Sequence, residues 1–276
     1  MKWGLVLSGG GALGLANVGI LEVLERENLR PNSVAASSMG AIIGALYCVG
    51  IKPSEMEDLC IRWSLRDFLH HYPWPFRRFQ KALFRFTFRK KMLHLLHQTR
   101  IRDCTTQFLC IAGRQKKQIQ WSNMLRKGFA EEATRNLEPY VFPPDTRMLD
   151  AIMASSAIPP FFHPIRIGID MFVDLCNFAG APAHIMRTRL HPDIVIATDT
   201  APRYGLLTRM LPPSWSKILN ASEDLLKLNA KAADLIILPD MPASTWRFDK
   251  AEAFIEAGRK AAEKALPEIK RLIKTL

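Results

Sequence analysis

Ser38 stands among small residues that could make a serine hydroxyl a nucleophile. It is the central residue of Ala36-Ser37-Ser38-Met39-Gly40, with a small residue two places before it and another two places after it. Hydrolases use this spacing because small neighbours let the backbone fold sharply and lift the hydroxyl off a strand. A serine that only caps a helix has the same local sequence, so the motif alone leaves both interpretations open.

A second segment, Ser8 to Gly14, is rich in glycine. Such a segment lets the backbone run close to an anion and points N–H groups at it from a helix N-terminus. Gly9, Gly11 and Gly14 also match the G-x-G-x-x-G spacing of dinucleotide-binding proteins. That interpretation requires an acidic residue about 20 residues further on, at the end of the second strand. Because the second strand ends in serines, the sequence favours an oxyanion site.

Both segments sit at predicted corners between a strand and a helix. The expected elements are a strand from Trp3 to Leu7, a helix to about Glu27, a strand from Val34 to Ser37, and a helix after Ser38-Met39-Gly40. One corner offers backbone N–H groups and the other offers a serine. Together they could attack a carbonyl carbon and stabilise the resulting oxyanion.

These motifs together resemble the patatin-like phospholipase family. That family combines a glycine-rich oxyanion loop with a serine elbow and places a catalytic aspartate far downstream. The segment from Ala151 to Asp174 resembles the approach to that aspartate, most closely from Ala154 to Pro159. The resemblance implies a catalytic dyad of Ser38 and Asp174 without histidine. It implies an oxyanion hole formed by the N–H groups of Gly9, Gly10, Gly11 and Met39.

Three positions depart from the family pattern. Leu13 stands where the family usually has arginine or lysine, and Asn17 lies where histidine is common. Leu175 and Cys176 follow Asp174 in place of two small residues. If the backbone after Asp174 needed a positive φ, a leucine there would be strained by about 1–3 kcal/mol. The base role also requires burial to raise the pKa of an aspartate above its ordinary value of about 3.9.

A conventional triad with a histidine base is the competing catalytic arrangement. His163 is the histidine nearest to the predicted aspartate segment. The other histidines have no motif around them and are interpreted as packed or surface residues: His70, His71, His94, His97, His184 and His191. Ser155 and Ser156 lack the small-x-Ser-x-Gly pattern, so we interpret both as structural.

The whole chain of 276 residues has the composition of a globular α/β protein. Hydrophobic residues make up 48% and charged residues 23%. Strands and helices alternate without a long linker, which predicts one domain over residues 1–276. The predicted fold is a three-layer α/β/α sandwich with a mainly parallel central sheet. The five cysteines follow no C-x-x-C spacing, and no cofactor or metal site is expected.

Further elements are predicted from hydrophobic patterning. A capping box at Ser54 and Glu57 is expected to open a helix. The predicted strands are Gln107 to Ala112, Gln118 to Trp121, Asp193 to Asp199 and Leu235 to Leu238. The predicted helices are Asp145 to Ser155, Ser216 to Ala232, and Lys250 to Leu276 with an interruption near Pro267. The family resemblance fades between about Glu55 and Thr106, which we expect to be a divergent helical segment.

The net charge of +12 is partly concentrated between Trp74 and Lys91, which hold seven basic residues, six aromatic residues and no acids. As a helix, this segment would have an apolar side and a basic side. Such a helix suits peripheral contact with an anionic membrane, and it equally suits packing over the body with a solvated basic face. Nucleic acid is not expected as a partner, because no recognition module accompanies the charge.

The predicted function is that of a serine lipid acyl hydrolase of the phospholipase A or lysophospholipase type. Its substrates would be phospholipids, lysophospholipids or other acyl esters. The alternative is a catalytically weak or inactive homologue that binds lipid or a membrane surface. No stretch approaches the roughly 20 apolar residues of a membrane span. The apolar run up to Ala16 is not interpreted as a signal peptide, because its removal would delete the glycine-rich segment. We therefore expect a cytoplasmic protein, peripheral at the inner membrane surface.

Overall fold

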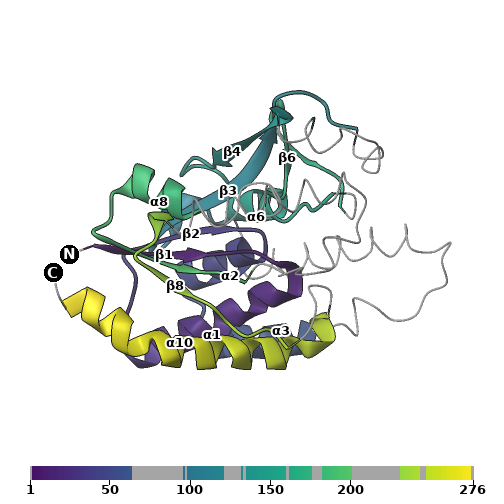
Figure 1. Ribbon diagram of the computed structural model, residues 1–276. Helices are drawn as coiled ribbons and strands as arrows, with labels where there is room; N and C mark the ends of the chain where they lie inside the picture. The colour runs from purple at the N-terminus through teal and green to yellow at the C-terminus, as the bar shows by residue number, and fades with distance from the viewer. Residues whose placement is uncertain are drawn as a thin grey trace.

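The computed structural model describes residues 2–63, 96, 98–120, 132, 135–159, 162–175, 182–200, 231–242 and 247–274. Their strands form one sheet with helices on both faces (Figure 1). The strands are β1 (Trp3–Leu7), β2 (Ser33–Ser37), β3 (Gln107–Gln115), β4 (Leu137–Val141), β5 (Ile165–Ile167), β6 (Asp170–Val173), β7 (Ile194–Thr198) and β8 (Leu235–Ile237). The helices are α1 (Ala16–Arg26), α2 (Met39–Cys48), α3 (Pro53–Trp63), α6 (Met148–Ser155), α8 (Ala183–Leu190) and α10 (Ala251–Lys274). Short 3-10 turns are η1 (Gly11–Leu15), η3 (Ile101–Asp103) and η6 (Phe248–Lys250).

The centre of the sheet is parallel. Strands β3, β2, β1, β7 and β8 lie side by side in one direction. Strands β4 and β6 run antiparallel to β3, and β5 runs antiparallel to β6. This arrangement confirms the predicted α/β fold with a mainly parallel sheet.

Alternating side chains of the central strands fill two separate cores. Leu5 and Leu7 belong to the larger core, together with residues of α1, α2, α6 and α10. Val6 belongs to the smaller core on the opposite face, together with Ala183 and Met186 of α8. The sheet is therefore the middle layer of three, as predicted.

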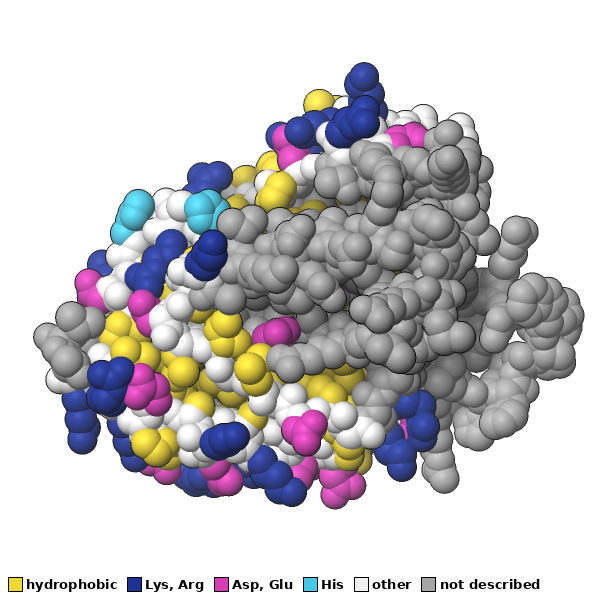
Figure 2. Space-filling view, viewed as in Figure 1, with side chains coloured by type: hydrophobic (Ala, Val, Ile, Leu, Met, Phe, Trp, Pro, Cys, Tyr) yellow, Lys and Arg dark blue, Asp and Glu magenta, His cyan; other side chains and the backbone are white. Residues whose placement is uncertain are grey.

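Helix α10 lies along α1 at a very short separation (Figure 1). A Cβ atom on Gly258 would collide with the backbone of Ala16, and one on Gly19 would collide with the backbone of Ile255. Only glycine at these two positions permits the contact. Ion pairs flank the contact, including Arg259 with Glu22 and Lys270 with Glu27, each at 2.6 Å between nitrogen and oxygen. Figure 2 shows basic and acidic side chains interspersed along this edge of the molecule.

Three local predictions are wrong. Helix α10 continues through Pro267, because Pro267 is exposed while Ala262 and Ile269 on either side stay in the core. Residues 118–120 form no strand, and β3 pairs with β4 instead. Helix α3 begins at Pro53, so Ser54 lies inside its first turn and does not cap it. Residues 74–91 and 216–230, both predicted to be helical, lie outside the described residues, and so does most of the divergent segment.

Strands β2 and β6 share one edge of β3. Strand β2 pairs with β3 up to Ile111, and β6 pairs with Gly113 and Arg114. Strand β4 pairs with Ile111 through Gln115, so it overlaps both and must occupy the other edge. Because β2 is parallel and β6 antiparallel to β3, the two strands approach each other end to end. The residues that follow the two strands, Ser38 after β2 and Asp174 after β6, are therefore brought close together beside Ile111.

Candidate active site

Ser38 lies at a sharp turn between β2 and α2. Its φ of 55° and ψ of −132° are exceptional for a residue other than glycine, and its side chain is 2% exposed. Gly40 makes the turn possible, because a Cβ atom there would lie 2.6 Å from the carbonyl oxygen of Ser8 and would collide with that of Leu7. The small residue two places after Ser38 therefore has the role that the sequence predicts.

Asp174 follows β6 and meets Ser38 at the end-to-end approach of the two strands. The Ser38 hydroxyl donates a short hydrogen bond to Oδ2 of Asp174. The aspartate is buried, and its backbone N–H donates to the carbonyl oxygen of Ala157 at 2.9 Å. The structure thus brings together the two side chains predicted to form a dyad.

Leu175, the residue after the aspartate, is not strained. Among the described residues, a positive φ outside glycine occurs only at Asn28, Ser38 and His191. The Leu175 side chain is buried in the smaller core and fills the space next to Gly113. The backbone strain that a positive φ would have caused at Leu175 is therefore absent.

Two serines of α6 and its C-terminus hold the backbone of Ser38. The Ser38 N–H donates to Oγ of Ser155 at 2.9 Å, and this hydroxyl donates to the carbonyl oxygen of Ile111 at 2.6 Å. The Ser156 hydroxyl donates to the carbonyl oxygen of Ser38 at 3.3 Å. Both serines are structural, as interpreted from the sequence, but the sequence did not indicate that they contact the elbow.

The glycine-rich segment lies directly against the elbow. A Cβ atom on Gly14 would lie 2.7 Å from the Cβ of Met39, so η1 and the first turn of α2 are in contact. Gly10 and Gly11 have φ values of 140° and 60°, which side chains rarely allow. Gly9, Gly10, Gly11 and Met39, the predicted oxyanion residues, therefore gather at one junction next to Ser38.

The first backbone N–H groups of η1 and of α2 lie at this junction, and they have no acceptor within their own helices. In η1, the first N–H group with an intrahelical acceptor is that of Leu13, which donates to the carbonyl oxygen of Gly10 at 3.3 Å. The N–H groups of Gly11 and Ala12 come before it and have no intrahelical acceptor. In α2, the first N–H group with an intrahelical acceptor is that of Ala41, which donates to the carbonyl oxygen of Ser38 at 2.9 Å. The amides of Met39 and Gly40 precede it. These groups can bind an anion beside the Ser38 hydroxyl.

Leu13 and Asn17, the two residues near the glycine segment that depart from the family pattern, lie in different surroundings. Leu13 is buried in the larger core, where it contributes apolar contact and no charge. Asn17 is buried behind the glycine segment, and its side chain bonds to the backbone of Ser8 and the hydroxyl of Thr198. Asn17 therefore belongs to the support of the loop.

His163 does not share the buried position of the serine and the aspartate. Its side chain is exposed, and the single hydroxyl hydrogen of Ser38 goes to Asp174. His184 and His191 are also exposed. His70, His71, His94 and His97 lie outside the described residues.

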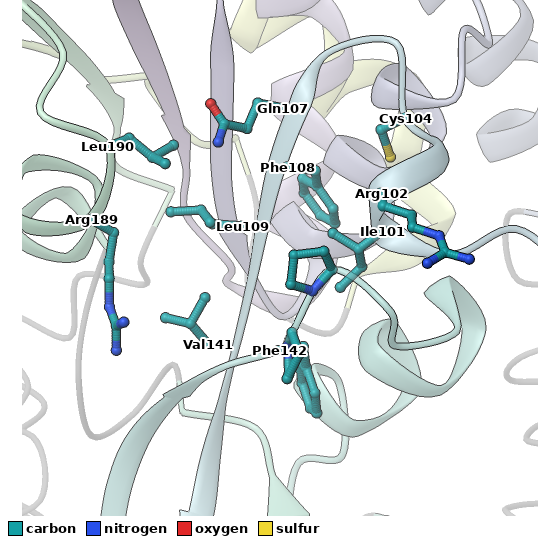
Figure 3. Close-up of a pocket in the computed structure, with 12 residues that line it drawn as sticks. Ile101, Arg102, Cys104, Gln107, Phe108, Leu109, Val141, Phe142, Arg189 and Leu190 are labelled. Atoms are coloured by element: carbon teal, nitrogen blue, oxygen red, sulfur yellow. The ribbon is translucent and has the colours of Figure 1, made fainter.

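A cavity of about 630 Å³ lies beside β3 (Figure 3). Its lining includes Phe108 and Leu109 at the start of β3, Phe142 after β4, and Arg189 of α8. The lining residue Val141 belongs to β4, which occupies the edge of β3 opposite to β2, so this cavity and the Ser38 junction lie on different edges of β3. None of the predicted site residues lines it.

The part of the chain that the structure describes has neither a candidate metal site nor a candidate membrane span. These residues contain no group of three or more His, Cys, Asp or Glu side chains arranged to hold a metal ion. None of their helices combines the length and apolar character needed to cross a bilayer.

Comparisons with known proteins give the chain's relatives. A family model described as patatin-like phospholipase matches residues 5–174, which include both corners and the aspartate. A patatin-like phospholipase domain-containing protein of Caenorhabditis elegans is 30% identical over 205 residues, covering 71% of this chain and 16% of that protein. A lysophospholipase of Candida glabrata is 27% identical over 125 residues, covering 42% of this chain and 7% of that protein.

The chain thus spans 16% or less of the length of these two relatives. Among solved structures, ExoU in its complex with SpcU from Pseudomonas aeruginosa gives a TM-score of 0.44 at 14% identity, covering 97% of this chain and 52% of that one. The family match extends over more than half of the 276 residues. The chain belongs to the patatin-like phospholipase family.

Proposed function

We propose that this protein hydrolyses acyl esters of lipids, with Ser38 as nucleophile and Asp174 as general base. The observation that supports this most directly is the hydrogen bond from the Ser38 hydroxyl to the Asp174 carboxylate, made at a strained turn next to the glycine segment. Strain at a buried polar residue is typical of sites built for chemistry. Membership of the patatin-like phospholipase family supports lipid esters as the substrate class.

In the first half-reaction, the Ser38 oxygen attacks the ester carbonyl carbon while Asp174 accepts the hydroxyl proton. The carbonyl oxygen becomes an oxyanion that the N–H groups of Gly9, Gly10, Gly11 and Met39 stabilise. When the tetrahedral intermediate collapses, the bond to the alcohol breaks and Asp174 returns the proton to the leaving alcohol. The acyl group then remains on Ser38.

In the second half-reaction, water attacks the acyl-serine and gives its proton to Asp174. The collapse of this intermediate releases a fatty acid and returns the proton to the Ser38 oxygen. Loss of a single oxyanion donor typically costs about 10² to 10³ in rate. Phospholipids and lysophospholipids both supply the required ester, and one relative is named as a lysophospholipase.

A lipid-binding protein without turnover was the alternative. Backbone strain at Leu175 would favour it, but among the described residues other than glycine a positive φ occurs only at Asn28, Ser38 and His191. We therefore favour the enzyme.

The test is hydrolysis of short acyl esters, lysophospholipids and diacyl phospholipids by the wild type, Ser38→Ala and Asp174→Asn. We expect both variants to fold and to lose turnover, and we expect fluorophosphonate labelling to disappear in Ser38→Ala. Ser33→Ala is the matched control, because Ser33 is a buried serine at the other end of β2. Undiminished labelling of Ser38→Ala, or full activity of Asp174→Asn, would contradict the proposal.

A further inference from the structure

Four polar side chains are buried directly behind the glycine segment. Asn17, Thr198 and Thr200 have no exposed surface, and Ser8 is 4% exposed. They come from three parts of the chain: the loop itself, α1, and the end of β7 with the residues after it. Buried polar groups are costly unless they are hydrogen-bonded, so their gathering at one place calls for an explanation.

The hydrogen bonds among them leave one consistent set of proton directions. The Thr200 hydroxyl lies 2.5 Å from the carbonyl oxygen of Gly9, which can only accept, so this hydroxyl donates there. It then accepts from the Ser8 hydroxyl at 2.9 Å, which in turn accepts from the Thr200 N–H at 2.8 Å. Each hydrogen of the two hydroxyls and of the Thr200 amide then has an acceptor.

Asn17 is oriented in the same way. Its Nδ2 lies 3.0 Å from the carbonyl oxygen of Ser8, which can only accept, so the amide nitrogen must point there. Its Oδ1 then accepts from the Thr198 hydroxyl at 2.8 Å, and that hydroxyl accepts from the Ser8 N–H at 3.0 Å. The network therefore holds the carbonyl groups of both Ser8 and Gly9.

Holding these two carbonyl groups fixes the direction of two amides. In a planar trans peptide, the C=O of one residue and the N–H of the next point in opposite directions. The bond from Asn17 to the Ser8 carbonyl thus sets the direction of the Gly9 N–H. The bond from Thr200 to the Gly9 carbonyl sets that of the Gly10 N–H. Gly10 also packs so closely on the Thr200 carbonyl that a Cβ atom there would collide with it.

We propose that Thr200 and Asn17 are positioning residues for the oxyanion site: Thr200 turns the peptide plane between Gly9 and Gly10 so that the Gly10 N–H points away from the segment after β7 and toward the ester oxygen, and Asn17 fixes the peptide plane before it. Ser8 and Thr198 join the two bonds into one network. This inference rests on the proposed function, because it assigns the Gly10 amide to an oxyanion. It also explains why position 17 holds an asparagine, which can donate to the Ser8 carbonyl and accept from Thr198 at the same time.

The experiment compares Thr200→Val with Thr200→Ser. Valine keeps the shape but cannot donate to Gly9, whereas serine can. We expect Thr200→Val to lower kcat about 10- to 100-fold with KM within about twofold, and Thr200→Ser to stay within about threefold of the wild type. Asn17→Leu, which has a similar shape but cannot donate to Ser8, should lower kcat similarly. Thr106→Val is the matched control, since Thr106 is a buried threonine next to the start of β3.

A second readout does not depend on turnover. The ¹H–¹⁵N signals of Gly9 and Gly10 should shift, and their hydrogen exchange should accelerate, in Thr200→Val but not in Thr200→Ser or Thr106→Val. If the wild type hydrolyses no ester, the proposed function fails, and these amide signals still decide whether the network orients the loop. Unchanged glycine signals in Thr200→Val, or a loss of kcat that serine does not restore, would overturn the inference. If Thr200→Val does not fold, Asn17→Leu provides the same comparison at the Gly9 amide.

Discussion

Ser155 completes the backbone hydrogen bonding of Ser38. Its hydroxyl accepts from the Ser38 N–H at 2.9 Å and donates to the carbonyl oxygen of Ile111 at 2.6 Å. It therefore bridges β2 and β3 at the point where their pairing ends, between Ser38 and Ile111. Without this bridge, the buried N–H of Ser38 and the buried C=O of Ile111 would each lose a hydrogen-bond partner, at the point where β2 ends and β6 begins along the edge of β3.

We expect Ser155→Ala to destabilise the protein by about 1–3 kcal/mol and to reduce turnover, because it leaves these two buried backbone groups unsatisfied. Ser156→Ala should have the smaller effect on both, since Ser156 is only half-buried and its bond to Ser38 is longer, at 3.3 Å. Urea denaturation and ester hydrolysis measure the two effects. Equal losses in the two variants would show that the Ser155 bridge has no special importance.

Gly40→Ala should impair the elbow. The added methyl group would lie 2.6 Å from the carbonyl oxygen of Ser8 and would collide with that of Leu7, so the start of α2 must move away from β1. We expect a loss of about 1–3 kcal/mol in unfolding free energy and at least a tenfold loss of kcat. Gly44→Ala is the control on the same helix, where the methyl group would meet only side chains, at 3.1 Å or more. A Gly40→Ala variant as active as Gly44→Ala would contradict this account of the turn.

Gly258→Ala should separate α10 from α1. Alanine is favoured over glycine within a helix by about 1 kcal/mol, so any destabilisation must come from the collision with the backbone of Ala16. We expect the collision to dominate and the unfolding free energy to fall by about 1–3 kcal/mol. Lys264→Ala, at an exposed position of α10, should be nearly neutral. Thermal or urea unfolding checks both, and a stabilised Gly258→Ala variant would be the contrary result.

The thiols of Cys60 and Cys104 should react slowly. Burial raises the pKa of Cys60 to about 12 and that of Cys104 to about 11. At pH 8, iodoacetamide should therefore modify both residues much more slowly in the folded protein than in urea, as peptide mass spectrometry can measure. Fast modification of either residue in the folded protein would be inconsistent with its burial.

The same two thiols make stability depend on pH. Their pKa values are higher in the folded than in the unfolded protein, in which a cysteine titrates near 8.5. Their contribution is therefore complete below about pH 8.5 and is lost as the pH rises toward 11 and 12. Cys104→Ser, which removes one of these groups, should reduce the decline in unfolding free energy between pH 8.5 and 10.5. An unchanged decline would contradict the assignment.

The two corners could be predicted from the sequence because each depends on neighbouring residues. Each corner is determined by residues within a few positions of it: an apolar strand, the glycine run, and the small residues around Ser38. The meeting of Ser38 with Asp174 joins residues 136 positions apart, and it depends on β2 and β6 sharing an edge of β3. Nothing local to either residue encodes that pairing, and only the family resemblance indicated it.

The wrong predictions have a similar cause. A strand at Gln118 to Trp121 would have made a tight hairpin with β3, but Pro139 and its neighbours in β4 occupy that edge. The interruption at Pro267 was inferred from the residue alone, and packing on both sides of it keeps the helix continuous. Thr198 and Thr200 lie at the end of a typical β segment, where threonine is common, so their bonds to the glycine loop were missed.

The contact between α1 and α10 also bears on how the chain folds as it leaves the ribosome. Arg26 and Glu263, which form an ion pair across this contact, are 237 positions apart. The glycine-bearing face of α1 is translated before α10 and remains uncovered until α10 has left the exit tunnel. During that interval the nascent chain lacks the helix that packs on α1, and we expect the surface around Gly19 to be exposed to solvent until α10 covers it.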